Sequence, residues 1–235
     1  MKKILYMAAT VLLCSSCFHV NTNWTGGGKN AIKGEGPVIT KSFDLKDFDR
    51  IVINGQADAV FTQSDAYEVT LRAQENIFDY VDYRVEGTTL ILELKDKRTV
   101  RSTEFDVTLK APALKRLEIN GAADFEIPAG LKSDDDLQIE VNGAGDLTFN
   151  AVRCNNLTIQ ANGAADVDLT DINVQKLKVD VNGAGDVIVE GNAADADLSV
   201  NGAGDIDATR LKVIGKVSKH AAGLAKIKMY THFFG

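Results

Sequence analysis

The acidic side chains with the most regular spacing belong to a five-residue motif, Asn-Gly-x-[Ala/Gly]-Asp, which occurs six times. Successive copies begin 66, 22, 20, 20 and 19 residues apart, and 66 is three times 22. Carboxylates bind hard cations such as Ca²⁺ and also act as general acids or bases, so a repeated Asp suggests either kind of site. The Asn and Asp residues of the copies are Asn54, Asp58, Asn120, Asp124, Asn142, Asp146, Asn162, Asp166, Asn182, Asp186, Asn201 and Asp205.

We expect these residues to form a structural ladder. Each Asp can accept backbone N–H bonds from the glycine turn, which offsets the repulsion between carboxylates of neighbouring copies. The calcium alternative lacks the nine-residue Gly-Gly-x-Gly-x-Asp period of known calcium-binding repeats. The enzyme alternative needs two carboxylates set apart at one special place, whereas here the same Asp recurs in every copy. The sequence therefore predicts no metal, no cofactor and no catalysis.

A second group of charged residues is basic and lies near the C-terminus. No acidic residue follows Asp207, so its six basic residues give segment 208–235 a charge of +6, against −7 for the whole chain. Two interpretations stay open: lysines that protect an open sheet edge from association, or a docking end for anionic glycan or lipid headgroups. The acidic remainder argues against nucleic-acid binding. The basic residues are Arg210, Lys212, Lys216, Lys219, Lys226 and Lys228.

Residues 1–16 have the pattern of an export signal peptide, with two lysines, a short apolar run and small residues. The residues before Cys17 resemble a bacterial lipobox, which makes Cys17 the predicted lipidation site. Cys14 as the modified residue, or an ordinary cleaved signal, are the alternatives. Residues 17–37 are then a lipid anchor and a glycine-rich tether. A lipid on Cys17 would attach the protein to the outer membrane of the cell envelope. The membrane is therefore a predicted partner.

The residues that flank each motif predict the elements that carry it. Counted from the Asn, positions −3, −1, +5 and +7 are apolar in all six copies, and the residues between them are mostly polar. This alternation is typical of strands with one buried face. Asn-Gly could close antiparallel hairpins and give a β-sandwich. A stack of parallel turns explains better why whole repeats are alike, because each turn then meets a copy of itself.

The sequence thus predicts an all-β fold, a single-stranded parallel β-helix with turns of about 20 residues. Regular turns are expected over residues 117–235, ending in a degenerate basic cap. Residues 38–116 contain strand-like runs without the expected motifs, which predicts irregular opening turns or a small β cap. The one cysteine outside the predicted signal and anchor, Cys154, is expected to be a core residue.

The motif copies, the predicted lipoprotein signal and the segment Ser42-Phe43-Asp44-Leu45-Lys46-Asp47-Phe48-Asp49-Arg50-Ile51 together resemble the head GIN domain family of putative auto-transporter adhesins, over roughly residues 40–220. The resemblance implies a Gram-negative envelope protein with a right-handed β-helix, and it brings no catalytic residues. We therefore expect a non-catalytic lipoprotein that serves adhesion or carbohydrate binding, with a glycan or another envelope component as partner. A structural envelope scaffold without a specific ligand is the alternative, and a carbohydrate-active enzyme is the less favoured one. The oligomeric state does not follow from the sequence.

Overall fold

The computed structural model describes residues 31–102 and 104–230, and this part of the chain is all-β as predicted. The predicted signal peptide, Cys14 and Cys17 lie outside the described residues. One mixed sheet contains 14 strands, and β1 and β7 form a separate pair. The elements are β1 (Ala31–Lys33), β2 (Val38–Ser42), β3 (Arg50–Gln63), β4 (Glu68–Gln74), η1 (Glu75–Tyr80), β5 (Val81–Glu86), β6 (Thr89–Leu94), η2 (Lys95–Lys97), β7 (Thr99–Arg101), β8 (Phe105–Ala111), β9 (Arg116–Ile127), β10 (Leu131–Lys132), β11 (Leu137–Asn150), β12 (Val152–Gly183), β13 (Val187–Gly202), β14 (Asp205–Val213), β15 (Val217–Gly223) and β16 (Lys226–Lys228), where η marks a 3-10 helix.

The part of the chain from β1 to β8 mixes parallel and antiparallel pairs. β2 pairs antiparallel with β4, β4 with β8, and β5 with β6. The prediction of a tether over residues 17–37 is wrong for its last seven residues, because they belong to this part of the fold. β1 pairs with β7, and the N–H of Gly34 donates to the carbonyl of Arg101 at 2.9 Å.

The long gap between the first two motif copies does not hold three turns stacked between them. β3 carries the first copy and pairs directly with β9, which carries the second, so that Asn54 lies opposite Asn120. The intervening residues fold against the other edge of β3, where β6 and β8 pair with it in parallel. The chain therefore builds outward from β3 in both directions.

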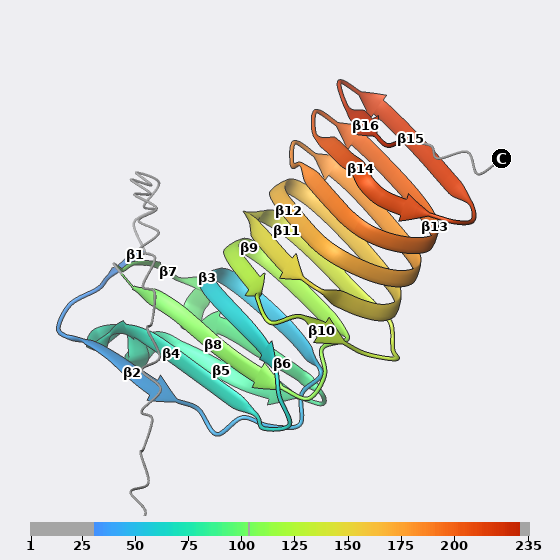
Figure 1. Cartoon of the computed structure of the whole chain (residues 1–235). Coiled ribbons are helices and arrows are strands. Elements are labelled where there is room, and N and C mark those ends of the chain that lie inside the picture. Colours follow the sequence, from blue (N-terminus) through green and yellow to red (C-terminus); the bar gives the residue numbers. More distant parts are fainter. Residues whose placement is uncertain (1–30, 103, 231–235) are drawn as a thin grey trace, which may run out of the picture.

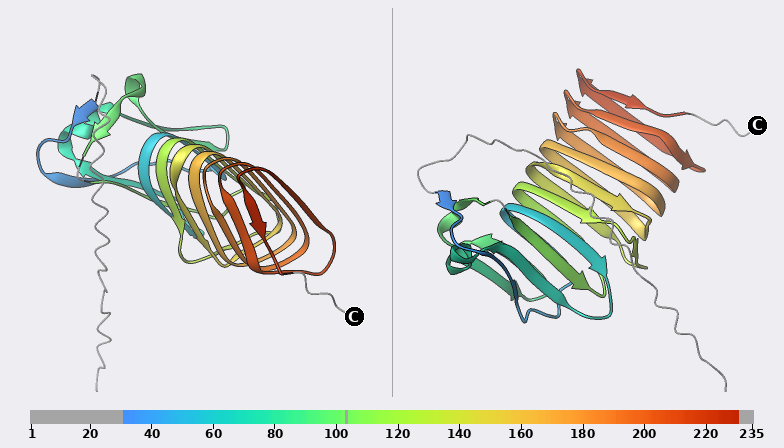
Figure 2. Two further views of the ribbon diagram at one scale, coloured as in Figure 1. Left: turned by 90° about the horizontal axis from the view of Figure 1, so that it is seen from above. Right: turned by 60° about the vertical axis from the view of Figure 1, so that its left-hand side comes forward.

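From β9 to β16 the strand pairs are parallel and successive motif copies lie directly on one another. Asn120 lies opposite Asn142, and Asn142 opposite Asn162. Figure 1 shows these strands as a stack, and Figure 2, seen from above, shows them as nested turns. β12 is 32 residues long and contains the fourth copy and the first two residues of the fifth, so the strand runs through the Asn162-Gly163 corner without a break. This pairing does not match the hairpins of the sandwich alternative.

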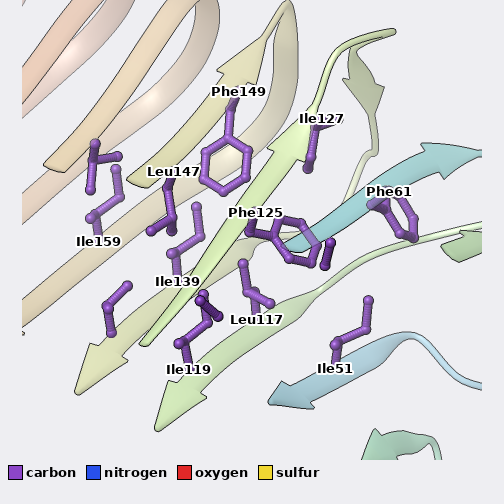
Figure 3. Packing of buried hydrophobic residues seen from close by; sticks show 14 of the residues in the cluster. Ile51, Phe61, Leu117, Ile119, Phe125, Ile127, Ile139, Leu147, Phe149 and Ile159 are labelled. Carbon is purple, nitrogen blue, oxygen red and sulfur yellow. The ribbon is translucent and has the colours of Figure 1, made fainter. Parts of the chain in front are cut away.

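The predicted inward positions form the core of the stack. All 24 residues at positions −3, −1, +5 and +7 are buried, with at most 2% of their surface exposed. Figure 3 shows one such column, in which Ile51, Leu117, Ile139 and Ile159 follow one another from turn to turn. Phe125 and Phe149, which are also buried, pack edge to face with ring centroids 6.1 Å apart. The alternating sequence pattern thus becomes continuous apolar columns along the stack.

The motif glycine lies where neighbouring copies approach most closely. A Cβ added to Gly163 would be 2.0 Å from the carbonyl oxygen of Gly143, and its φ of +142° is rare for residues with a side chain. Gly55, in the first copy, has a φ of +119° but no atom within 4 Å of its added Cβ. Backbone conformation alone therefore favours glycine at Gly55, whereas Gly163 also needs the space.

Mutation of these two glycines separates the effect of backbone conformation from the effect of close packing between turns. We expect Gly55→Ala to lower the free energy of unfolding by about 1–2 kcal/mol, the cost of the backbone conformation. Gly163→Ala should cost about 3 kcal/mol or more, because backbone of the adjacent turn must also move. Urea unfolding monitored by circular dichroism measures both values. Equal losses in the two variants would contradict close stacking at the glycine.

Candidate functional site

The motif asparagines form a ladder of side-chain hydrogen bonds along the stack. The Nδ2 group of Asn120 donates to Oδ1 of Asn54 at 3.0 Å, and the same bond joins each later Asn to the one before it, at 3.0 to 3.4 Å. An amide can donate and accept at once, so a column of identical Asn side chains satisfies itself. The ladder holds the corners of neighbouring turns together, which is the structural role predicted for these residues.

The motif aspartates accept backbone N–H bonds, but from the next turn rather than from their own glycine turn. Oδ1 of Asp124 accepts the N–H of Asp146 at 2.9 Å, Asp166 accepts that of Asp186 at 2.8 Å, and Asp186 accepts that of Asp205 at 2.7 Å. The prediction of an acceptor role was correct, whereas the donor it assigned was wrong. Parallel in-register pairing is the reason, since it points each N–H toward the neighbouring copy.

Two aspartates of the column, Asp58 and Asp146, accept no such bond from any described residue. Burial, then the charges of Asp124 and Asp106, raises the pKa of Asp58. Burial, then the charges of Asp124 and Asp166, raises the pKa of Asp146. The carboxylate repulsion expected from the sequence is therefore present in the stack. Within residues 31–102 and 104–230, no group of three or more His, Cys, Asp or Glu side chains could hold a metal ion.

The predicted basic residues gather on the last two turns, at the end of the stack opposite β1 and β2 (Figure 1). Arg210 forms an ion pair with Glu190, and Lys212 lies beside Asn192 in the sheet. We call the described residues 208–230, which carry all six basic side chains, the basic end.

The basic end contains a seventh copy of the motif, which sequence reasoning missed. The segment Ala222-Gly223-Leu224-Ala225-Lys226 lies on the sixth copy, with Ala222 opposite Asn201 and Lys226 opposite Asp205. Ala222 ends the amide ladder, and Lys226 replaces the repeated Asp. The signals in the sequence were the retained glycine and its spacing of 21 residues from Gly202.

Lysines thus meet the end of the aspartate column. The N–H of Lys226 donates to Oδ1 of Asp205 at 3.0 Å, and Nζ of Lys228 lies 3.4 Å from Oδ2 of the same carboxylate. The N–H of Lys216 donates to Oδ1 of Asp195 at 2.7 Å, while its side chain is exposed. Lys219 lies on β15, opposite the buried Leu198. The six residues therefore share one end of the stack but differ in what they contact.

Cys154 is buried, as predicted, and burial raises the pKa of its thiol to about 11. Its Sγ–H donates to the carbonyl of Asn156 at 3.5 Å. A thiol with this pKa is protonated at neutral pH and is a poor nucleophile. Cys154 therefore acts as a core residue.

The sequence of this chain matches a known protein family. The sequence profile of a family described as "Putative auto-transporter adhesin, head GIN domain" matches residues 47–170 and 137–232. The chain belongs to this family. The resemblance inferred from the motif copies is thereby confirmed, and membership of an adhesin family indicates an envelope-associated protein.

Several solved structures have a fold similar to that of this chain. Putative adhesins from Bacteroides fragilis NCTC 9343 and Parabacteroides distasonis ATCC 8503 match with TM-scores of 0.71 and 0.74, at 24% and 22% identity, over 85% of this chain and 100% of each of theirs. A putative lipid binding protein from Parabacteroides distasonis ATCC 8503 matches with a TM-score of 0.62, at 22% identity, over 86% of this chain and 100% of its own. At these identities the likeness shows a shared fold.

No curated protein is significantly similar to the chain. Among the residues placed by the structure, no helix has the length and apolar character to cross a membrane.

The aspartate column predicts a pH-dependent mutant effect. Because the folded-state pKa of Asp146 is raised, its ionised form costs stability above that pKa, and the cost disappears below the ordinary value of 3.8. Asp146→Asn should therefore stabilise the protein at pH 7 by about 0.5 kcal/mol, a small gain because solvent screens the exposed carboxylate. The gain should vanish near pH 3, as thermal melts can show.

Asp186→Asn is the matched control, since Asp186 accepts the N–H of Asp205. This variant weakens a charge-assisted hydrogen bond, so it should lower the melting temperature at pH 7. A stabilised Asp186→Asn protein, or an Asp146→Asn gain that persists at pH 3, would contradict the role of the missing N–H donor.

Proposed function

We propose that the protein is a non-catalytic cell-envelope lipoprotein, anchored to the outer membrane through Cys17, that presents a rigid stack of turns for adhesion. Membership of the adhesin family and the lipobox-like sequence support this proposal. The turns from β9 to β16 belong, in this proposal, to a right-handed, single-stranded parallel β-helix. In-register parallel pairing of copies about one turn apart supports that inference, and right-handed connections are the general rule for parallel strands.

The observation that carries the proposal is the placement of the two ends of the fold. The described chain begins at β1, on one end of the stack, and the basic end lies at the other (Figures 1 and 2). A lipid at Cys17 would therefore leave the basic end pointing away from the attachment. The amide ladder and the continuous apolar core stiffen the turns between them, so the stack acts as a spacer.

The walls of the stack are less suited to recognition. From β9 to β14 the aromatic side chains are Phe125 and Phe149, which are fully buried, so these walls offer no ring for sugar stacking. We therefore assign adhesion to the basic end, where cationic side chains could contact anionic glycans or another envelope component. The plain polar walls favour the second candidate, a structural scaffold without a specific ligand.

Two features support a non-catalytic role. The motif Asp recurs in six copies and accepts a backbone N–H in four of them, which is how a scaffold residue behaves. The thiol of Cys154 is buried and protonated.

Orientation-controlled adhesion separates the adhesin from the scaffold. Beads carry the chain from residue 18 onward, attached either through its N-terminus or through its C-terminus. Adhesion to intact bacteria and to cultured epithelial cells should require attachment through the N-terminus, which leaves the basic end free. No adhesion in either orientation would favour the scaffold, and equal adhesion in both would overturn the assignment to the basic end.

The lipid anchor has a direct test with a matched control. Cys17→Ala should abolish incorporation of labelled palmitate and move the protein from the membrane fraction to the soluble fraction. Cys14→Ala should leave both unchanged. Loss of labelling in the Cys14 variant alone would assign the lipid to Cys14, and no labelling of the wild type would show an ordinary cleaved signal.

A further inference from the structure

The outer edge of β15 is open in the described structure. β15 pairs with β13 on one side and with no described strand on the other, and each of its residues is exposed. Large apolar side chains of the chain segments before and after β15 are exposed: Ile214 is 74%, Leu224 83% and Tyr230 68% exposed. A row of unpaired backbone N–H and C=O groups beside apolar side chains is a template for one more strand.

Lys219 decides which strand could be added. It lies opposite Leu198, whose column of inward residues is apolar on every earlier turn. Paired residues on parallel strands point to the same face of the sheet, so Lys219 continues the core column as a charged residue. A further apolar strand would bury the ammonium group without a partner, which is costly. A strand with a carboxylate at that position would pair with it.

A second copy of this chain does not fit the edge. Two copies joined end to end through β15 would form an antiparallel pair that puts both Lys219 side chains on the same inward face, and β15 has no carboxylate to pair with them. The free edges at the other end of the sheet belong to β2 and β5. β2 carries no acidic residue, and the two carboxylates of β5, Asp82 and Glu86, are already paired with Arg84.

We propose that β15 binds an extended acidic segment of another protein by strand addition, with a carboxylate of that segment paired to Lys219. Backbone pairing favours a polypeptide over a lipid or glycan, because headgroups and sugars cannot complete the ladder of a strand edge. Lys219 then has two roles, since the charge that admits an acidic strand also rejects another copy of the chain. This inference rests on the proposed function, for which it names the class of partner.

The probe is a peptide with the sequence of residues 196–202, which form the strand beneath β15. Three labelled versions differ only at the position of Leu198, which is Glu, Leu or Lys. Fluorescence polarisation with the chain from residue 18 onward measures their binding. The Glu peptide should bind about tenfold more tightly than the Leu and Lys peptides, and added salt should reduce the difference.

Charge reversal makes the test specific. Lys219→Glu should invert the order, so that the Lys peptide binds better than the Glu peptide. Lys216→Glu changes the net charge equally but lies outside the core column, so it should keep the wild-type order. Equal effects of the two variants, or equal binding of the three peptides to wild type, would overturn the proposal.

Other occupants of the edge give distinct results, each of which overturns the proposal. Peptide binding only after removal of residues 231–235 would show that the chain covers its own edge. Self-association of wild type in analytical ultracentrifugation would show that a second copy does. Binding to phosphatidylglycerol vesicles that Lys219→Glu abolishes, with no peptide binding, would identify a lipid surface. Failure of all three peptides with wild type and with the shortened chain would leave Lys219 as edge protection.

The two proposals fail separately. Orientation-dependent adhesion of beads with no peptide selectivity would leave the proposed function intact and remove this inference. Peptide selectivity without adhesion of beads in either orientation would remove the adhesive function instead.

Discussion

The carbonyl oxygen of one motif glycine occupies the place where the next glycine would carry a Cβ. This close approach fixes the register, because a shift by one residue would put a side chain against a backbone carbonyl and turn the core residues outward. With the register fixed at the motif, the motif asparagines and the residues that flank them lie on their counterparts in the next copy. Each position must therefore accommodate a column of identical or similar side chains. Asn suits such a column because its amide group both donates and accepts a hydrogen bond.

The same constraint explains where specific recognition can occur. A column of identical residues presents the same chemistry along the whole stack, and its aspartates repel one another wherever a backbone N–H does not reach them. Within the described stack from β9 to β16, the last turn departs from this repetition. There Ala222 ends the amide ladder, Lys226 meets the carboxylate of Asp205, and Lys219 interrupts the apolar column. The uniform stack thus serves as a spacer, and its last turn has the features of a contact surface.

The regular part of the fold could be predicted from the sequence because its information is local and repeated. Alternation at four positions per copy predicted 24 core residues, from Ile51 to Ala208, and all of them are buried. The part between β3 and β9 could not, since its antiparallel pairs join segments that share no pattern. β1 was missed for the same reason. For residues 38–116 the sequence left irregular turns and a small β cap as alternatives, and it did not predict that the chain folds over the far edge of β3. The seventh copy has lost both the Asn and the Asp and keeps only Gly223 and Ala225, so no motif search based on Asn and Asp could find it.

Distances along one outward column test in-register stacking most directly. In a chain from residue 18 with Cys154→Ala, Val60→Cys can be combined in turn with Asp168→Cys, Ile188→Cys and Asp207→Cys. These positions lie in one column. Spin labels on each pair should give mean distances that rise by about 4.8 Å per added turn in pulsed electron resonance. Distances that fail to rise from turn to turn, as in a sandwich of hairpins, would contradict the stack.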